Sequence, residues 1–336
     1  MDEYLAALES ELRSMVTSPD PVFDSYFGMF RYHMGWTDAQ FAPIQTNAGK
    51  RIRPLLCLLS CEAVGGLWRP ALPVAAAIEL AHNFSLIHDD IEDASDERRG
   101  RTAVWKVWGL AQGLNAGDGM FVLARLALDH LCERGLPIEK CSAVSGVFDE
   151  ATFALCQGQF LDLGYEKRLD VTADEYLKMI RGKTAALISA ATRIGAMLAS
   201  ENTHIINAFA RFGENIGLAF QITDDILGIW GDPSVTGKSA ATDILSKKKT
   251  LPALLGLGHP KQGEALREIY RRARLEQEHV TRVLELLDAG EVRAETQRRA
   301  DEFRSIALDA LDATGMKNRA MERLRELAEM MTRRVK

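Results

Sequence analysis

Apolar residues recur at intervals of three and four positions along almost the whole chain, which predicts amphipathic α-helices. Strand-like alternation is absent, and we expect no β-strands. Punctuating residues such as Gly65-Gly66 and Gly231-Asp232-Pro233 mark breaks between the helical segments. The pattern predicts thirteen helices, over residues 2–16, 19–35, 52–66, 71–93, 103–110, 116–133, 138–162, 172–198, 203–229, 250–257, 262–289, 292–313 and 316–334.

Many helices joined by short connections are typical of a helical bundle. Four segments, 71–93, 138–162, 172–198 and 203–229, are long and apolar on nearly every face, so we expect them to be central. A length of 336 residues would suit two average domains, but single domains of this size occur. Because no repeat or linker interrupts the chain, we expect one all-α domain over residues 1–336.

The composition of the chain limits which ligands it can bind and where in the cell we expect it. The formal net charge of −6 argues against a surface that attracts nucleic acid, so an anionic ligand would need local cations or a metal ion. The five cysteines lack metal-binding spacing, and we expect them as reduced thiols. The acidic segment MDEYLAALES is unlike a targeting peptide, and no uncharged apolar run reaches the roughly 18 residues of a membrane span. We therefore expect a cytoplasmic protein without membrane insertion.

Two acidic clusters lie near the ends of apolar helices. In the first, HDDIED at residues 88–93, Asp89 and Asp93 fall one turn apart on one helix face. His82 and Ser85 precede Asp89 on that face. In the second, QITDDILG at residues 221–228, Gln221 and Asp224 share a face, and Asp225 flanks it.

Acidic runs are most often solvated surface, but these follow strongly apolar stretches. Each also lies near a helix C-terminus, where the helix dipole disfavours an anion by roughly 0.3–1 kcal/mol. Something cationic should offset this cost. Carboxylate oxygens suit Mg²⁺, which commonly bridges to substrate phosphates.

Basic residues alternate with these acidic clusters along the chain. GKRIRP at residues 49–54 opens a helix, a position that favours anions. A P-loop at Gly231–Ser239 is rejected, because its spacing is one residue too long and no strand precedes it. Together the clusters suggest diphosphates held by metal and by Arg or Lys side chains, with the further cations at Arg98, Arg99, Arg101, Lys183, Lys238 and Lys247–Lys249.

These motifs together resemble the trans-isoprenyl diphosphate synthases, or polyprenyl synthetases, which include the farnesyl and geranylgeranyl diphosphate synthases. The matching elements are GKRIRP at 49–54, DDIED at 89–93, GQFLDL at 158–163 and FQITDDILGIWGDPSVTGK at 220–238. They occur in family order over roughly residues 45–255. The resemblance implies one all-α bundle of the isoprenoid synthase type around a central cavity, and a homodimer.

The resemblance implies a Mg²⁺-dependent prenyltransferase that joins an allylic diphosphate to isopentenyl diphosphate. Three Mg²⁺ ions would hold the allylic diphosphate between the two acidic motifs. Gln159 and Asp162 would line the same cavity, and Asp243 and Lys248 would close it. The residue roles it implies are these: metal ligands Asp89, Asp93 and Asp224, with Asp90 and Asp225 in support; contacts to the allylic diphosphate from Arg98, Lys183 and Lys238; contacts to isopentenyl diphosphate from Lys50, Arg53, His82 and Arg99; and oxygen dipoles for the carbocation from Thr184 and Gln221.

One position departs from the family pattern. The second motif usually ends in a third aspartate, one turn after Asp224, and this chain has Gly228 there. A subset of the family resembles this chain in that respect, so we do not interpret the change as loss of activity. Asp232, one further turn along and between Gly231 and Pro233, is a candidate substitute.

Product length should depend on the residues that precede Asp89. Phe84 lies five positions before it and Ser85 four, and the motif has no insertion. In the family this combination resembles a synthase of C20 geranylgeranyl diphosphate, with farnesyl (C15) and longer products as alternatives. More remote alternatives are a class I terpene cyclase and an inactive partner subunit. The intact GKRIRP element and the complete first acidic motif argue against these two.

Overall fold

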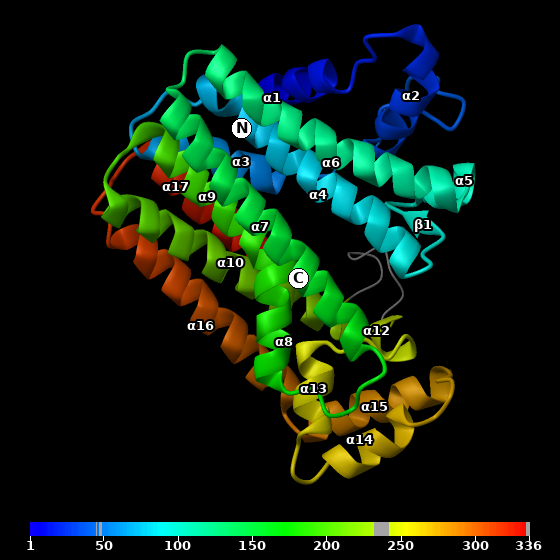
Figure 1. Ribbon diagram of the computed structural model, residues 1–336. Helices are drawn as coiled ribbons and strands as arrows, with labels where there is room; N and C mark the ends of the chain where they lie inside the picture. The colour runs from blue at the N-terminus through cyan, green and yellow to red at the C-terminus, as the bar shows by residue number, and fades with distance from the viewer. Residues whose placement is uncertain (45, 47–48, 232–241, 334–336) are drawn as a thin grey trace. The chain divides into compact units, whose positions relative to one another are not determined.

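The computed structural model describes residues 1–44, 46, 49–231 and 242–333, and its fold is all-α, as predicted (Figure 1). These residues divide into two compact units. Unit 1 comprises residues 1–148 and 191–201, and unit 2 comprises residues 149–190 and 202–336. The expectation of a single domain around a central cavity stays a prediction.

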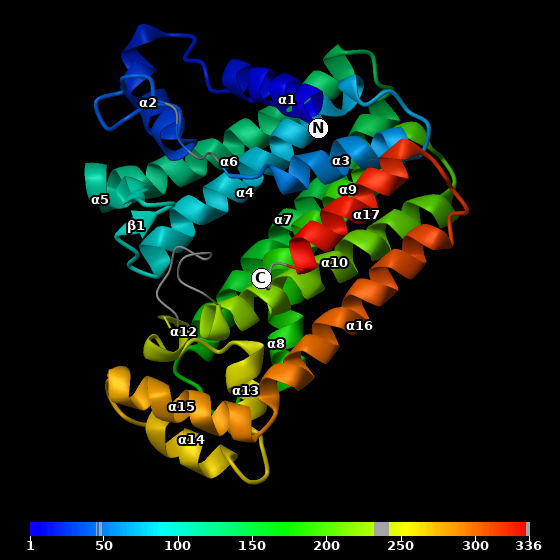
Figure 2. The ribbon, with the colours of Figure 1, turned by 180° about the vertical axis from the view of Figure 1, so that it is seen from behind.

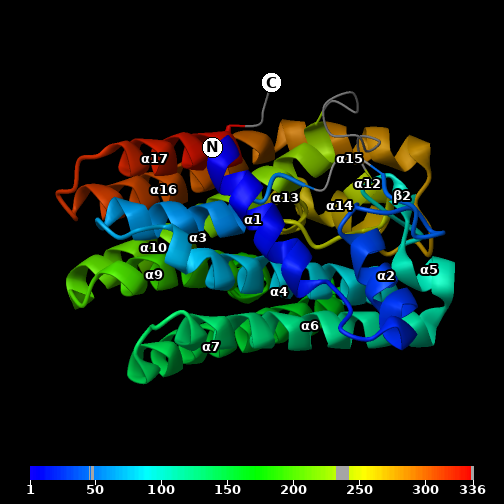
Figure 3. The same ribbon diagram turned by 90° about the horizontal axis from the view of Figure 1, so that it is seen from above.

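Unit 1 is built around the long apolar helix α4, whose residues Leu72–Ala81 are all buried. Helix α6 runs beside α4 (Figure 3), and α3 also packs on α4. The elements are α1 (Asp2–Met15), η1 (Pro21–Phe23), α2 (Asp24–His33), α3 (Ile52–Ala63), η2 (Arg69–Ala71), α4 (Leu72–Glu92), β1 (Glu97–Arg98), β2 (Arg101–Thr102), α5 (Val104–Trp108), α6 (Leu110–Glu133) and the start of α7 (Ile138–Tyr165).

Unit 2 is built around α10, with α16 packed along it (Figures 1 and 2). Its core includes Leu218, Ile222 and Ile229 of α10, together with Leu251 and Leu254. The elements are the end of α7, α8 (Ala173–Ile180), the π-helix η3 (Arg181–Ala185), α9 (Ala186–Ala199, which ends in unit 1), α10 (Thr203–Trp230), α12 (Thr242–Leu245), α13 (Leu251–Leu257), α14 (Gly263–Tyr270), α15 (Gln277–Ala289), α16 (Val292–Asp312) and α17 (Arg319–Thr332).

Local capping chemistry defines several helix boundaries that periodicity alone missed. The predicted helix 262–289 is wrong as a single element, since it is two helices, α14 and α15. The side chain of Glu276 caps α15, and His279 Nδ1 accepts the Glu276 N–H at 3.0 Å. This reciprocal capping starts a new helix at Gln277. The predicted helix 172–198 contains the π-helix η3, and the predicted helix 116–133 begins earlier, at Leu110.

A short hairpin contradicts the expectation that β-strands are absent. Strands β1 and β2 pair antiparallel, Glu97 with Thr102 and Arg98 with Arg101. The two loop residues, Arg99 and Gly100, have φ angles of +55° and +72°. Positive φ at both loop positions matches the right-handed twist of a two-residue hairpin. Two-residue strands are too short to produce an alternating pattern in the sequence.

Two further expectations concern cysteines and membrane spans. Cys132 and Cys141 are paired in a disulfide, so the expectation of reduced thiols is wrong for these two.

The segment Arg69–Glu92 is long and apolar enough to cross a membrane by length and composition. However, 78% of its apolar window is buried inside the protein, as in the core helix of a globular fold. The absence of membrane insertion stays a prediction.

Candidate active site

The first acidic motif lies at the C-terminal end of α4. Asp93 is the C-cap residue, and its N–H donates to the carbonyl of Asp89 at 2.9 Å, which places the two residues one turn apart. The Asp89 side chain is 19% exposed and Asp93 is exposed, whereas Asp90 is buried with 1% exposure. Asp89 and Asp93 are therefore accessible to a ligand, and Asp90 is directed into unit 1.

The buried carboxylate of Asp90 is held by Arg98 from the hairpin. Arg98 Nε donates to Asp90 Oδ1 at 2.8 Å, and Nη2 donates to the same oxygen. Arg98 Nη2 also lies 3.8 Å from Asp89 Oδ2. Burial raises the pKa of Asp90, and the hydrogen bonds and charge of Arg98 oppose this rise. Arg98 thus orients the motif, and its predicted contact with the allylic diphosphate stays a prediction.

Cations that are distant in the sequence gather beside this motif. Burial, followed by the charges of Arg53 and Arg99, lowers the pKa of His82 well below its usual value. At neutral pH the His82 ring is therefore uncharged. Arg99 Nη2 lies 3.4 Å from the position that a Cβ atom would take on Gly49, so the guanidinium covers the start of the GKRIRP element. The structure brings Arg53, His82 and Arg99 together, and Lys50 of the same element is exposed.

The remaining cation of the GKRIRP element, Arg51, has a structural role. Arg51 is buried and pairs with the buried Glu79 of α4, with Nη1 and Oε1 2.7 Å apart. The Nδ2 of Asn83 donates to the same Glu79 oxygen at 2.9 Å. Since a buried charge is stable only when it is paired and hydrogen-bonded, this contact fixes the start of α3 against α4.

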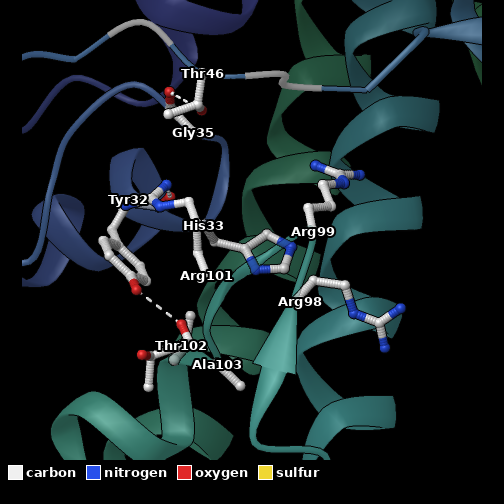
Figure 4. Close-up of a pocket in the computed structure, with 10 residues that line it drawn as sticks. Tyr32, His33, Gly35, Thr46, Arg98, Arg99, Arg101, Thr102 and Ala103 are labelled. Carbon is white, nitrogen blue, oxygen red and sulfur yellow. Dashed lines mark hydrogen bonds between the residues drawn. The ribbon is translucent and has the colours of Figure 1, made fainter. Parts of the chain in front are cut away.

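A basic pocket opens between α2, the following loop and the hairpin (Figure 4). Arg101 is engaged in the wall, because it donates to the carbonyls of Tyr32 and Thr37. His33 of α2 also lines this pocket. Burial, then the charges of Arg99 and Arg98, lowers the His33 pKa well below its usual value. The apolar periodicity of the α2 sequence does not indicate that His33 lines a pocket. The lining residues are Tyr32, His33, Gly35, Thr46, Arg98, Arg99, Arg101, Thr102, Ala103 and Val104.

The residues before the first motif form an aromatic contact. Phe84 is 7% exposed and packs against Phe121 of α6, with ring centroids 5.1 Å apart. It also meets the ring of His88, one turn along α4. Ser85 is half-buried, and its hydroxyl donates to the carbonyl of His82 at 2.8 Å. An aromatic side chain therefore fills the space next to α4, about one turn before Asp89.

The second acidic motif, in unit 2, is held by uncharged donors. Asp224 is half-buried, whereas Asp225 is buried with 3% exposure. The hydroxyl of Tyr176 and the backbone N–H of Leu251 donate to Asp225 Oδ2, and Gln221 Nε2 donates to Oδ1 at 3.1 Å. Burial raises the pKa of Asp225 to about 6 despite these hydrogen bonds. The contacts of Asp90 and Asp225 with the protein suit residues that hold the motif in place. Their role as supporting metal ligands stays a prediction.

Gln221 links Asp225 to the segment that carries Lys183. The hydroxyl of Thr184 donates to Gln221 Oε1 at 2.8 Å. Both residues lie in or face η3, and π-helical turns occur frequently at functional sites. The structure therefore joins Thr184, Gln221 and Asp225 in one chain of hydrogen bonds.

The GQFLDL element explains how Lys183 is positioned. A Cβ atom on Gly158 would lie 2.1 Å from the backbone nitrogen of Lys183, so only glycine lets α7 approach η3 this closely. Lys183 Nζ then donates to Asp162 Oδ2 at 2.6 Å. Gln159 is also on this part of α7. The element thus presents an ammonium group that is already paired with a carboxylate.

The lysines after the second motif separate into two kinds. Lys247 Nζ donates to the carbonyl of Arg272, and Lys249 Nζ donates to the carbonyl of Glu166 at 2.9 Å. Lys248 differs: desolvation acts to lower its pKa, but nearby carboxylates, with that of Asp243 first, raise it. Of the three, Lys248 is the one placed among carboxylates, whereas Lys238 and Asp232 lie outside the described residues.

Comparisons with known proteins agree with this geometry. The family model "Polyprenyl synthetase" matches residues 36–287. The chain is 38% identical over 330 residues to a (2E,6E)-farnesyl diphosphate synthase of Mycobacterium tuberculosis, covering 96% of this chain and 89% of the relative. It is also 38% identical over 290 residues to a geranylgeranyl diphosphate synthase of the same organism, covering 84% and 80%.

A solved structure extends the agreement to the whole fold. A polyprenyl synthetase from Streptomyces coelicolor A3(2) superposes with a TM-score of 0.90 at 34% identity and covers 98% of each chain. With the family model matching three quarters of the residues, and with the motifs of both units built as described, the chain belongs to the polyprenyl synthetase family of trans-isoprenyl diphosphate synthases.

Proposed function

We propose that this protein condenses an allylic diphosphate with isopentenyl diphosphate, 1′-4 head to tail, to give C20 all-trans geranylgeranyl diphosphate and free diphosphate. The observation that carries this proposal is the cation cluster beside the first acidic motif. The guanidinium groups of Arg53 and Arg99 act on the neutral ring of His82, and Arg98 contacts both Asp89 and Asp90. A group of cations at accessible carboxylates suits phosphate-bearing substrates with a divalent metal.

The residues fit Mg²⁺ as the cofactor. Within the described ranges, no three His, Cys, Asp or Glu side chains form a complete metal site of their own. A metal would therefore need phosphate oxygens and water to complete its shell, which is how Mg²⁺ usually binds. By resemblance, Asp89 and Asp93 would be the carboxylate ligands of two ions in unit 1, and Asp224 that of a third ion in unit 2. Three ions remain our proposal from the family resemblance.

The protein residues have distinct roles in this reaction. Bound Mg²⁺ would neutralise the diphosphate leaving group and so favour ionisation of the allylic carbon–oxygen bond. Lys183 and Lys248 would add positive charge at the same phosphate oxygens. The Thr184 and Gln221 oxygens would turn their dipoles toward the allylic cation. Lys238 is proposed as a further phosphate contact on the basis of resemblance only.

The second substrate requires a site of its own. Lys50, Arg53 and Arg99 would bind the diphosphate of isopentenyl diphosphate and hold its double bond in place for attack. The neutral ring of His82 would donate a hydrogen bond to that diphosphate. The proton released after condensation would pass to the departed diphosphate, so none of these side chains need act as the base.

The assay of this proposal uses the purified chain with labelled isopentenyl diphosphate, Mg²⁺ and one allylic primer at a time. Dimethylallyl, geranyl and farnesyl diphosphates should each be extended, with a C20 main product and no product in EDTA. A C15 main product would instead favour farnesyl synthesis, as in the mycobacterial relative that is 38% identical. Cyclic products made without isopentenyl diphosphate would favour a terpene cyclase, and complete inactivity an inactive partner subunit.

Phe84 is proposed to limit the product length, because it is buried against Phe121 next to α4. Phe84→Ala should open this space and shift the main product beyond C20, measured by chromatography of the dephosphorylated alcohols. Phe23→Ala removes an exposed ring and serves as the control. An unchanged product distribution in Phe84→Ala would exclude Phe84 as the limiting residue, and would leave the reaction type unaffected.

We propose a cytoplasmic homodimer, as the resemblance implies. Apolar side chains are exposed on α6 (Leu110, Leu114, Val122 and Leu126) and on α7 (Phe153 and Phe160). Phe153 and Phe160 lie seven positions apart and so share a helix face. Exposed apolar rows of this kind commonly mark an interface. Light scattering should give twice the 37.2 kDa of one chain, and a monomer would contradict the proposal.

A further inference from the structure

Gly228 is the position where this chain lacks the third aspartate of its family, and the structure shows what occupies the space. A Cβ atom on Gly228 would lie 2.1 Å from Oδ2 and 2.8 Å from Cγ of Asp243. Real Cβ contacts below 3.0 Å essentially do not occur. A side chain at position 228 would therefore displace the Asp243 carboxylate from its observed place.

One oxygen of the Asp243 carboxylate occupies space next to Gly228 that a side chain at position 228 would need. Positions 224 and 228 lie one turn apart on the same face of α10. An aspartate holds its carboxylate oxygens roughly 2.4 Å from its own Cβ, from standard bond lengths. Asp243 places Oδ2 at about that distance from the same point, although it belongs to α12. The space that the sequence of α10 leaves empty is filled from another helix.

The surroundings of Asp243 suit a role in binding a cation. Its charge helps to raise the pKa of Lys248, and it acts on Asp225 and Tyr270 in the same direction. Among the described residues, no side chain forms a hydrogen bond or ion pair with the Asp243 carboxylate at contact distance. The group is half-buried, so it is accessible to a ligand.

We propose that Asp243 supplies the third carboxylate of the second acidic motif, and that Gly228 is required because it leaves room for it. The ligand would be a divalent cation bound to diphosphate, so this inference rests on the proposed function. The motif would then be complete in space although it is incomplete in sequence. Asp232, the substitute considered from the sequence, is not needed for this arrangement.

The test exchanges the carboxylate between the two positions. Binding of inorganic diphosphate in the presence of Mg²⁺ is measured by calorimetry, which needs no turnover. Asp243→Ala, Asp243→Asn and Gly228→Ala should each weaken binding by about tenfold or more, in the range seen when groups that support a metal are removed. The double variant Gly228→Asp/Asp243→Ala should recover affinity to within a few-fold of the unmodified protein.

Gly164→Ala is the matched control, because a Cβ there meets nothing within 4 Å and the residue is in the same unit. It should bind diphosphate normally. Normal binding by both Asp243 variants, or a double variant no better than Asp243→Ala, would overturn the inference. If the unmodified protein shows no Mg²⁺-dependent binding of diphosphate and no product, the proposed function itself fails, which is a different result.

Discussion

The two aspartate pairs, Asp89-Asp90 in unit 1 and Asp224-Asp225 in unit 2, have the same layout and different partners. In each pair the first carboxylate is partly exposed, and the second is buried, at 1% for Asp90 and 3% for Asp225. Adjacent helical residues point about 100° apart, so only one of each pair can face the ligand while the other faces the core. The first member of each pair is therefore accessible to a ligand, and the second is held by contacts within the protein.

The buried members differ in what satisfies them. Asp90 is bound by the guanidinium of Arg98, a charged partner. Asp225 accepts hydrogen bonds from Tyr176, Gln221 and the Leu251 backbone, all of them uncharged. Burial raises the Asp225 pKa to about 6, although these hydrogen bonds and the charge of Lys248 oppose the rise. The same sequence pattern therefore has different electrostatics in the two units.

The largest expected effect concerns the exposed members. Asp89→Asn and Asp224→Asn keep the side-chain shape but remove the charge, and each should lower kcat/KM by about 1,000-fold, as the loss of a transition-state ligand does. The melting temperature should barely change. Asp96→Asn alters only an exposed pair with Lys106 and is the control. Activity within tenfold of the unmodified protein would contradict the division between binding and positioning residues.

The next effect tests the charged partner of Asp90. Arg98→Ala leaves a buried carboxylate without its cation, which should lower the free energy of unfolding by about 3–4 kcal/mol at pH 8. The loss should shrink as the pH falls, because burial raises the pKa of Asp90 and the carboxylate then takes up a proton. Denaturant unfolding measures both values.

Two variants serve as controls for Arg98→Ala. The double variant Arg98→Ala/Asp90→Asn should regain most of the lost stability, since no buried charge remains. Arg282→Ala, which breaks an exposed pair with Glu285, should cost less than about 1 kcal/mol. Equal costs for Arg98→Ala and Arg282→Ala would show that the Asp90 contact behaves as a surface ion pair.

The smallest effect tests the uncharged partners of Asp225. Its pKa is raised from 3.8 to about 6, so the folded state holds the proton more tightly than the unfolded state. Its contribution to stability should therefore fall as the pH rises from about 4 to about 6, by at most about 3 kcal/mol. Asp225→Asn does not titrate. The difference in unfolding free energy between the unmodified protein and this variant should decline over that interval, and a flat or rising difference would contradict the interpretation.

The sequence alone determined the helical fold and most of the candidate residues. Helical periodicity is local, so it located the long segments that became α4 and α10. The family motifs identified Asp89, Asp93, Asp224 and Lys183 by their order along the chain. The resemblance also singled out Lys248 from a run of three lysines, and its role stays a prediction; the neighbours Lys247 and Lys249 donate to backbone carbonyls.

Only the tertiary structure decided which partner each of these residues has. Sequence spacing does not reveal that Tyr176 contacts Asp225, that His33 lines a basic pocket, or that Asp243 fills the space at Gly228. These contacts join helices that are tens of positions apart, and they depend on how closely the backbones pack. Local periodicity determines which face of a helix is apolar, whereas the packing of distant segments determines what each buried charge meets there.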